Sequence, residues 1–403
     1  MEKKGTFAKH KTQNMNSDNA ITLSLTGADS HKVKIQAGQG SFSIGQAGRD
    51  KKKYDVLVEK DLPVNWNAFD AFTTPAGGLW PRFFYYWGND TGFVKWSEKR
   101  AVEDFSWCPD KPVSIDLSAA QIRSLYITAK DTPVNVILDH QNTAHSGIQR
   151  LGLFGIVEHF DIAATHANPF VIINPQTKKE KSALPYQLPH LKSLARITSL
   201  DIAVEPLAQA FDCQSLLQFP HLKNLNITGN MANVACLSKL KNLERIGIRY
   251  ALDIEHFPAL NSWPHLKSFI GWNIDSTTGK RLSTELKQLA KEKELEYSSV
   301  SKLRSAVWFT TEYGIPFTNW EPKKAKIATK AYKTAVKEIA KAKTEKEVKT
   351  AVAGLISIIN NLPGIETVER EDTGLAVSQL VEVSSLNISP ETGNKWFDEF
   401  RDF

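Results

Sequence analysis

Short stretches of alternating apolar and polar residues recur through the middle of this chain. The clearest is Leu222–Asn230, in which Leu225 and Ile227 alternate with polar residues. This period of two predicts a short strand with one buried face and one exposed face. Asn230 comes next, and its side-chain amide is suited to bonding backbone groups where the strand ends. One such unit cannot bury its own apolar face, so the pattern predicts stacked copies.

Irregular copies are present, beginning at Ile197, Leu243 and Leu266. The four first positions are 25, 21 and 23 residues apart. A Pro-His-Leu-Lys segment occurs three times in the same region, at Pro189, Pro220 and Pro264. The pattern L-x-x-L-x-L-x-x-N with this spacing resembles the leucine-rich repeat family, over about 110 residues. The resemblance implies a stacked parallel sheet whose outward residues line a concave surface.

Looser copies extend the pattern upstream, at Ile122–Ile127 and Ile148–Leu153. Val157–Ile162 follows only nine residues after the second of these, which is too soon for a full repeat. Either the chain makes a tight turn at Gly155, or the repeats have a different phase in this region. The polar, lysine-containing stretch Pro169–Pro189 is interpreted as an exposed insertion.

The N-terminal part has its own pattern. Period-two runs between Ile21 and Val58, separated by turn residues, predict a small antiparallel sheet. The aromatic-rich stretch Trp80–Trp96 then has two interpretations: a core that covers the first strand of the solenoid, or a surface that stacks on a ligand or partner. We favour the core.

The last third predicts helices. Ile327, Ala331 and Ile339 lie on one apolar face, and Thr344–Glu347 is a capping box that opens a second amphipathic run. Ser389-Pro390 opens a last helix. The expected class is therefore α/β, a leucine-rich repeat solenoid with an N-terminal β-rich capping domain and a C-terminal helical domain. The expected boundaries are a flexible tail at 1–19, the β-rich domain at 20–112, the solenoid at 113–320 and the helical domain at 321–403.

The formal net charge of +6 invites a nucleic-acid hypothesis. Residues 323–349, however, hold ten lysines and three glutamates, and the remaining chain is close to neutral. A lysine-rich helical face is usually only solvated. Binding of nucleic acid or an anionic surface through Lys323–Lys349 remains an alternative.

Three widely spaced cysteines support neither a disulfide framework nor a thiolate metal site. The start of the chain is polar and basic without an apolar core, and no run reaches the length of a membrane span. We expect a cytoplasmic protein with no membrane association.

The sequence contains no phosphate-binding loop, no dinucleotide fingerprint, no serine-nucleophile elbow and no metal-ligating histidine pair. We therefore expect no enzyme, no cofactor and no metal. An enzyme whose site lies in the N-terminal β domain remains an alternative, and it requires a buried polar pocket beside Trp80–Trp96.

Protein binding is the leading hypothesis, because continuous outward strand faces hold proteins. An arginine–aromatic cluster on that face has the composition of an interface hot spot. The alternative is that Tyr250 or Trp272 packs under the helical cap. The tail segments Ile365–Asp372 and Trp396–Phe403 resemble those of bacterial leucine-rich repeat proteins of unassigned role, which suggests an immunity protein that neutralises a toxin. The expected partner-binding residues, on the repeat strands, are Tyr126, Asp201, Asn224, Asn226, Arg245, Arg249, Tyr250 and Trp272.

Overall fold

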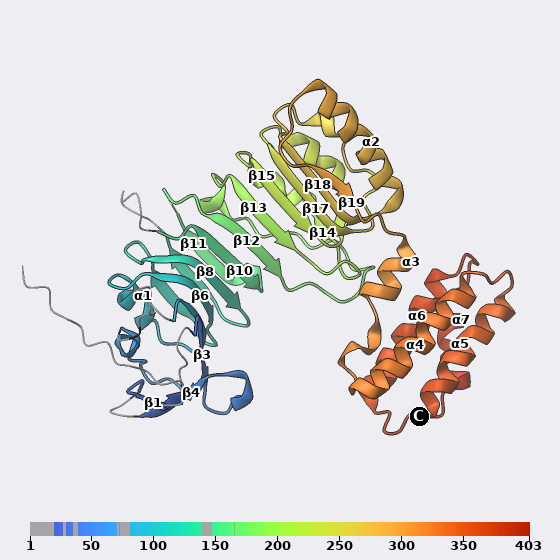
Figure 1. Ribbon diagram of the computed structural model, residues 1–403, viewed down its shortest axis with the longest axis horizontal. Helices are drawn as coiled ribbons and strands as arrows, with labels where there is room; N and C mark the ends of the chain where they lie inside the picture. Colours follow the sequence, from blue (N-terminus) through green and yellow to red (C-terminus); the bar gives the residue numbers. More distant parts are fainter. Residues whose placement is uncertain are drawn as a thin grey trace, which may run out of the picture. The chain divides into compact units, whose positions relative to one another are not determined.

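The computed structural model describes residues 20–26, 30–34, 39–70, 72, 81–138, 147–164 and 166–403. The expected tail at 1–19 and Trp80 lie outside these ranges. Within them, one open sheet holds twelve strands and is followed by helices (Figure 1), which confirms the mixed α/β class. The strand order is β19 (Ser299–Ser301), β18 (Ser268–Ile274), β17 (Arg245–Ala251), β15 (Asn224–Thr228), β13 (Ser199–Ala203), β12 (Phe170–Pro175), β10 (Arg150–Gly155), β8 (Ile122–Ala129), β6 (Val102–Cys108), β5 (Phe83–Trp87), β3 (Ser41–Gln46) and β4 (Val56–Val58).

The chain divides into two compact units. The N-terminal unit comprises Met1–Gln176, Leu188–Ile202 and Gln218–Asn224. The C-terminal unit comprises Thr177–Gln187, Ala203–Leu217 and Leu225–Phe403.

From β6 to β12 in the N-terminal unit, successive strands alternate between two parallel sheets. The second sheet has three strands, β7 (Val113–Asp116), β9 (Val134–Ile137) and β11 (Phe160–Ala163), in the order β11-β9-β7. The short spacing after Leu153 is thereby explained, because β11 belongs to this second sheet and does not start a new repeat. Gly155 makes the turn between the sheets with φ +83°, and a side chain there would collide with the carbonyl oxygen of Ala129.

Two expectations for this unit are wrong. β1 (Ala20–Leu23) and β2 (His31–Lys34) do pair antiparallel, but β3 pairs parallel with both β4 and β5. Alternation identifies strands but not their direction, and the connection through η1 (Lys51–Lys53) returns the chain for parallel pairing. The expected insertion at Pro169–Pro189 contains β12, a strand of the large sheet that pairs with β10 and β13 and buries one face through Val171 and Ile173.

The aromatic residues after Pro81 form the core of the N-terminal unit. Phe84 and Phe93 are buried together with Trp66 of η2 (Trp66–Phe69), and α1 (Gly92–Ser97) carries Phe93 into this cluster. The indole of Trp66 donates to Asp90 (2.6 Å), so its polar atom is satisfied. The interpretation of this stretch as a core is confirmed for Phe84, Phe93 and Trp96, whereas Tyr85 is exposed. The stretch does not cover the first strand of the sheet, because β5 lies inside the sheet between β3 and β6.

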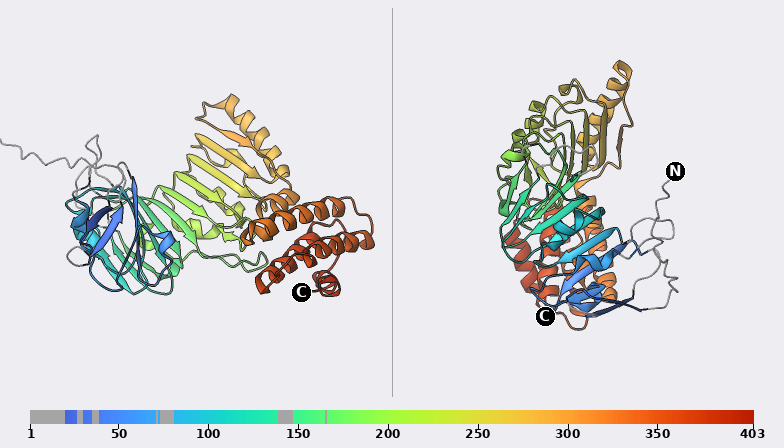
Figure 2. Two further views of the ribbon diagram at one scale, coloured as in Figure 1. Left: turned by 60° about the horizontal axis from the view of Figure 1, so that its bottom comes forward. Right: turned by 90° about the vertical axis from the view of Figure 1, so that its left-hand side faces the viewer.

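In the C-terminal unit the second layer changes from strands to helical turns. Two short strands, β14 (Phe211–Asp212) and β16 (Met231–Ala232), pair parallel. Three 3₁₀ helices then follow successive strands: η5 (Cys213–Gln218), η6 (Val234–Lys239) and η7 (Leu260–Ser262). A fourth, η4 (Lys192–Leu194), precedes them in the chain and belongs to the N-terminal unit. Helix α2 (Ser276–Glu292) then packs alongside β18 and β19 (Figure 2).

Asn230 performs the role expected from its position. Its side chain is 2% exposed, and its Nδ2 donates to the carbonyl oxygen of Ala208 at 2.8 Å. The bond joins the end of β15 to the loop of the preceding copy. Ala251 occupies the corresponding place in β17 and is also buried, so an asparagine ladder does not continue there.

A left-handed backbone position recurs at the strand ends of the C-terminal unit. Gly229, Tyr250, Asn273 and Lys302 have φ of +103°, +50°, +52° and +55°. The strand registers place Tyr250 opposite Asn273, and Asn273 beside Lys302. Non-glycine residues adopt this conformation rarely and at a cost of about 1–3 kcal/mol.

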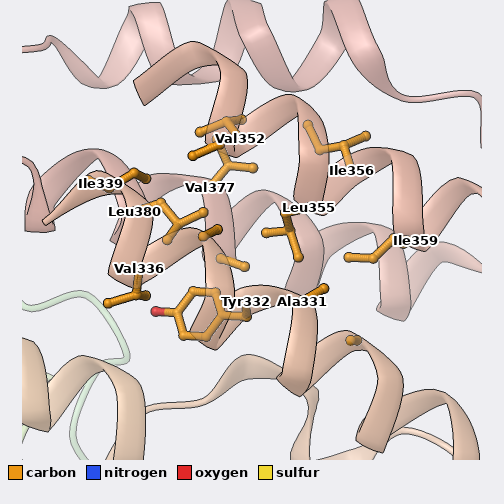
Figure 3. Close-up of a cluster of buried hydrophobic side chains, with 14 of the residues drawn as sticks. Ala331, Tyr332, Val336, Ile339, Val352, Leu355, Ile356, Ile359, Val377 and Leu380 are labelled. Atoms are coloured by element: carbon orange, nitrogen blue, oxygen red, sulfur yellow. The ribbon is translucent and has the colours of Figure 1, made fainter. Parts of the chain in front are cut away.

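The last third forms a four-helix bundle in the C-terminal unit. Its helices are α4 (Pro322–Ile339), α5 (Glu345–Asn360), α6 (Thr367–Val383) and α7 (Pro390–Phe400), preceded by α3 (Ala306–Trp308), η8 (Phe309–Tyr313) and η9 (Pro316–Asn319). Apolar side chains from α4, α5 and α6 converge on one core (Figure 3). Among the described helices, none has the combination of length and apolarity needed to cross a membrane.

Candidate functional site

The outward face of the parallel sheet carries the residues expected to bind a partner. Alternate side chains on each strand are buried, and the intervening ones remain partly exposed. Tyr126, Asp201 and Asn224 lie in the N-terminal unit, whereas Asn226, Arg245, Arg249, Tyr250 and Trp272 lie in the C-terminal unit.

In the N-terminal unit the outward residues mostly contact their neighbours on the same face. The ring of Tyr126 lies over Gly152, where a side chain would collide with it, and stacks on Phe154 with ring centroids 5.9 Å apart. Asn224 donates through Nδ2 to the hydroxyl of Ser199 at 2.9 Å. Asp201 is half-buried opposite Ile172. These contacts hold the side chains against the sheet.

Asn226 repeats this arrangement in the C-terminal unit. Its amide lies over Gly247 of the adjacent strand, where a Cβ atom would meet the amide oxygen. The glycine at 247 thus makes room for the asparagine, and the pair forms a flat polar part of the face.

Arg245 is held by an ion pair. Its guanidinium binds Glu296 through two hydrogen bonds of 2.6 and 2.8 Å, and these bonds raise the pKa of Arg245 and lower the pKa of Glu296. Arg245 also lies four residues from Arg249 along an extended strand, a separation of about 13 Å. The expected grouping of Arg245 with Arg249 and the aromatic residues is therefore not formed.

The remaining expected residues are brought together. Arg249 and Trp272 are cross-strand partners, and the Tyr250 ring meets the Trp272 ring edge-on with centroids 5.0 Å apart. Tyr250 also contacts Tyr313, with ring centroids 5.2 Å apart. We call Arg249, Tyr250, Trp272 and Tyr313 the Tyr250 cluster. Tyr250 has a positive φ, which it shares with Gly229, Asn273 and Lys302 at the neighbouring strand ends, so this conformation belongs to the sheet rather than to the cluster alone.

Tyr313 is the member that the sequence did not indicate. It ends η8, a single turn of π-helix, which is a rare element that occurs often at functional sites. Burial and the neighbouring charge of Glu205 raise the pKa of Tyr313 to about 12. Its position in an irregular segment, outside any repeat, leaves no periodic signal that would have identified it.

The Tyr250 cluster offers a cation beside aromatic surface. Arg249 is exposed, and the described part of the chain gives its side chain no ion pair. A free guanidinium beside aromatic rings can bind a carboxylate while the rings cover apolar surface. Tyr250 and Trp272 are half-buried, so they are positioned before any partner arrives.

A polar pocket of about 320 Å³ lies beside Tyr86 in the N-terminal unit. Its lining includes Asp61, Asn89 and Lys111, and the Lys111 Nζ lies 2.8 Å from the Asp61 carboxylate. Hydrogen bonds from Lys111 and Asn89 lower the pKa of Asp61, which keeps this carboxylate ionised. Such a carboxylate serves as an ion-pair partner rather than as a general acid.

The described residues contain no group of three or more histidine, cysteine or acidic side chains placed to hold a metal ion. Comparison with known proteins finds no matching family model, no matching curated protein and no matching solved structure.

Proposed function

We propose that this protein is a non-enzymatic protein-binding scaffold built as a leucine-rich repeat solenoid, with its principal binding site at the Tyr250 cluster. The observation that carries the proposal is the convergence of Arg249, Tyr250 and Trp272 with Tyr313 on one exposed face. Arginine, tyrosine and tryptophan are the residue types most enriched at interface hot spots.

The preorganisation of the cluster supports the same function. Each aromatic ring is already held by another ring, so little side-chain entropy is lost when a partner binds. Arg249 supplies the polar specificity, and its free guanidinium favours a partner that presents a carboxylate at the contact. Neutralisation of a bacterial toxin is one form of this function.

The test compares baits that differ at the cluster. Wild-type chain and an Arg249→Ala/Trp272→Ala double variant capture proteins from a lysate of the source organism, and each captured protein is then titrated against both purified baits. We expect a partner whose affinity falls at least about 30-fold in the double variant, equivalent to the loss of more than about 2 kcal/mol typical of a hot spot.

Arg245→Ala and Tyr297→Ala are the matched controls. The Arg245 side chain is bound to Glu296. Tyr297 is an exposed aromatic residue that does not belong to the Tyr250 cluster. Both variants should retain wild-type affinity. If every partner binds the double variant as tightly as wild type, the Tyr250 cluster is not the binding site. For the toxin form of the function, co-expression of the wild-type chain but not of the double variant should rescue cells that express the captured toxin.

A further inference from the structure

The four-helix bundle has an open groove between α4 and α5. It has a volume of about 800 Å³, and its floor is made of small or apolar residues, among them Ala335, Ala351 and Gly354. Ile327 and Ile358 stand on its two walls with 46% and 42% of their surface exposed. A Cβ atom added at Gly354 would meet nothing within 4 Å, so the groove is open above this residue.

The groove carries positive charge on one side. Lys323, Lys326 and Lys330 line the α4 wall, and no ion pair to them is found among the described residues. Other lysines of the bundle are paired, as Lys324 with Glu369 (3.4 Å) and Lys349 with Glu399 (2.8 Å). The unpaired lysines therefore leave a cationic edge beside an apolar floor.

Helix α6 carries the complementary surface. Val368 and Leu375 are exposed by 60% and 51%, and their spacing of seven residues places them on one face. Glu371 and Glu382 continue the same stripe at helical spacing, and both are exposed. This face of α6 thus carries both exposed apolar residues and exposed glutamates.

We infer that the groove of one copy of this chain binds the Val368–Glu382 face of α6 in a second copy. The lengths match, because α6 with 17 residues and α4 with 18 residues each span about 26 Å. The apolar residues of α6 would cover Ile327 and Ile358, and its glutamates would pair with the unpaired lysines. Salt therefore weakens the contact, since exposed pairs are screened.

The contact joins two different surfaces, so it is heterologous. The internal face of α6 is already committed to the core of its own bundle through Val377 and Leu380 (Figure 3). The second copy consequently binds to the opposite, exposed face. This self-association does not depend on the Tyr250 cluster and goes beyond the proposed binding function.

Sedimentation velocity on the full chain tests the inference. We expect concentration-dependent association between about 1 and 200 μM, weakened several-fold when NaCl rises from about 50 to about 500 mM. Ile358→Glu places a negative charge on the wall of the groove, and Leu375→Lys replaces an apolar residue of the α6 face by a cation. Both positions are about half exposed, so each variant should keep the wild-type circular dichroism spectrum and thermal midpoint.

Mixing the two variants is the decisive step. Each alone should sediment as a monomer, whereas an equimolar mixture should form a complex, because the intact groove of Leu375→Lys meets the intact α6 of Ile358→Glu. If Ile358→Glu fails to fold, Lys326→Glu/Lys330→Glu replaces it, since both lysines are on the surface.

Three results would overturn the inference. The first is a wild-type chain that stays monomeric throughout this concentration range. This result overturns the inference even where the chain binds anionic vesicles or nucleic acid through these lysines. The second is association that neither variant weakens. The third is a mixture of the two variants that remains monomeric. Undiminished association of Leu375→Lys alone would instead place groove against groove.

Discussion

At the residue scale, Asn230 shows how one buried side chain connects the end of β15 to the loop that precedes β14. Its amide satisfies the Ala208 carbonyl oxygen, which the alanine variant would leave buried without a donor. We expect Asn230→Ala to lower the free energy of unfolding by about 1–3 kcal/mol, measured by urea denaturation. Asn394→Ala, on the exposed surface of α7, should change it by no more than about 0.5 kcal/mol. Equal effects of the two substitutions would show that the Asn230 bond is not stabilising.

Tyr313 gives the Tyr250 cluster a measurable pH dependence. Its pKa of about 12 lies above the ordinary tyrosine value of 10.0, so the folded chain holds this proton more tightly than the unfolded chain does. The stability that this tyrosine contributes is therefore complete below pH 10 and is lost as the pH rises through about 12.

The absorbance difference between wild type and Tyr313→Phe near 295 nm should titrate with a midpoint of about 12. Glu205→Gln should lower this midpoint, because it removes the negative charge that disfavours the phenolate, while the contribution of burial remains. A midpoint at the ordinary tyrosine value in the wild-type chain would contradict the contact between Tyr313 and Tyr250.

The sequence identified strand residues of the candidate site but not their contacts. Period-two alternation places Arg249 and Trp272 on the outward face, and the register confirms that they are neighbours. It does not reveal that Glu296, fifty-one residues away, binds Arg245, or that Tyr313 reaches Tyr250. Both contacts come from segments outside the repeats, where no period relates position in the chain to position in space.

At the element scale, the capping box at the start of α5 is a local feature that the sequence predicted and the structure confirms. Thr344 accepts a hydrogen bond from the Glu347 amide, and the Glu347 carboxylate accepts one from the Thr344 amide. We expect Thr344→Ala to lower the stability of the bundle by about 1 kcal/mol, measured by thermal denaturation, and Thr344→Ser to have little effect.

The same cap predicts a pH effect with a defined sign. Backbone hydrogen bonds from Lys343 and Thr344 lower the pKa of Glu347. The contribution of this carboxylate is therefore present above its ordinary pKa and is lost as the pH falls through the lowered value. A Thr344→Ala chain that melts with the wild type at every pH would show that the cap does not limit the stability of α5.

Strand direction could not be predicted at this scale. The runs at Phe42 and Val56 were recognised as strands, yet their alternation is equally compatible with antiparallel and parallel pairing. The sequence does not predict the strand β12, because lysines and prolines follow it in the same stretch and their composition is typical of a loop. Its apolar residues Val171 and Ile173 are nevertheless fully buried. Backbone pairing with β10 and β13 therefore outweighed the polar composition of the surrounding sequence.

At the scale of the whole molecule, the change in the second layer accounts for the unequal spacing along the chain of the strands of the large sheet. The N-terminal unit closes each turn with a strand such as β9 or β11, whereas the C-terminal unit uses 3₁₀ turns and finally α2. Different closing elements need different numbers of residues, so the period cannot be constant. The outward strands keep a common register because the backbone bonds within the large sheet, and not the closing elements, determine it.

The bundle provides the last prediction, because its core is self-contained. Buried residues from Phe317 to Trp396 form one cluster, and Trp320 donates to Asp372 within it at 2.9 Å. A fragment of residues 315–403 should therefore fold without the sheet, giving a helical circular dichroism spectrum and a cooperative thermal transition. Leu355→Ala, which empties a buried core position, should destabilise this fragment by about 2–5 kcal/mol. The exposed Leu375→Ala should change it by less than about 0.5 kcal/mol. A gradual, non-cooperative melt would instead mean that the helices depend on contacts such as Tyr250–Tyr313 for their packing.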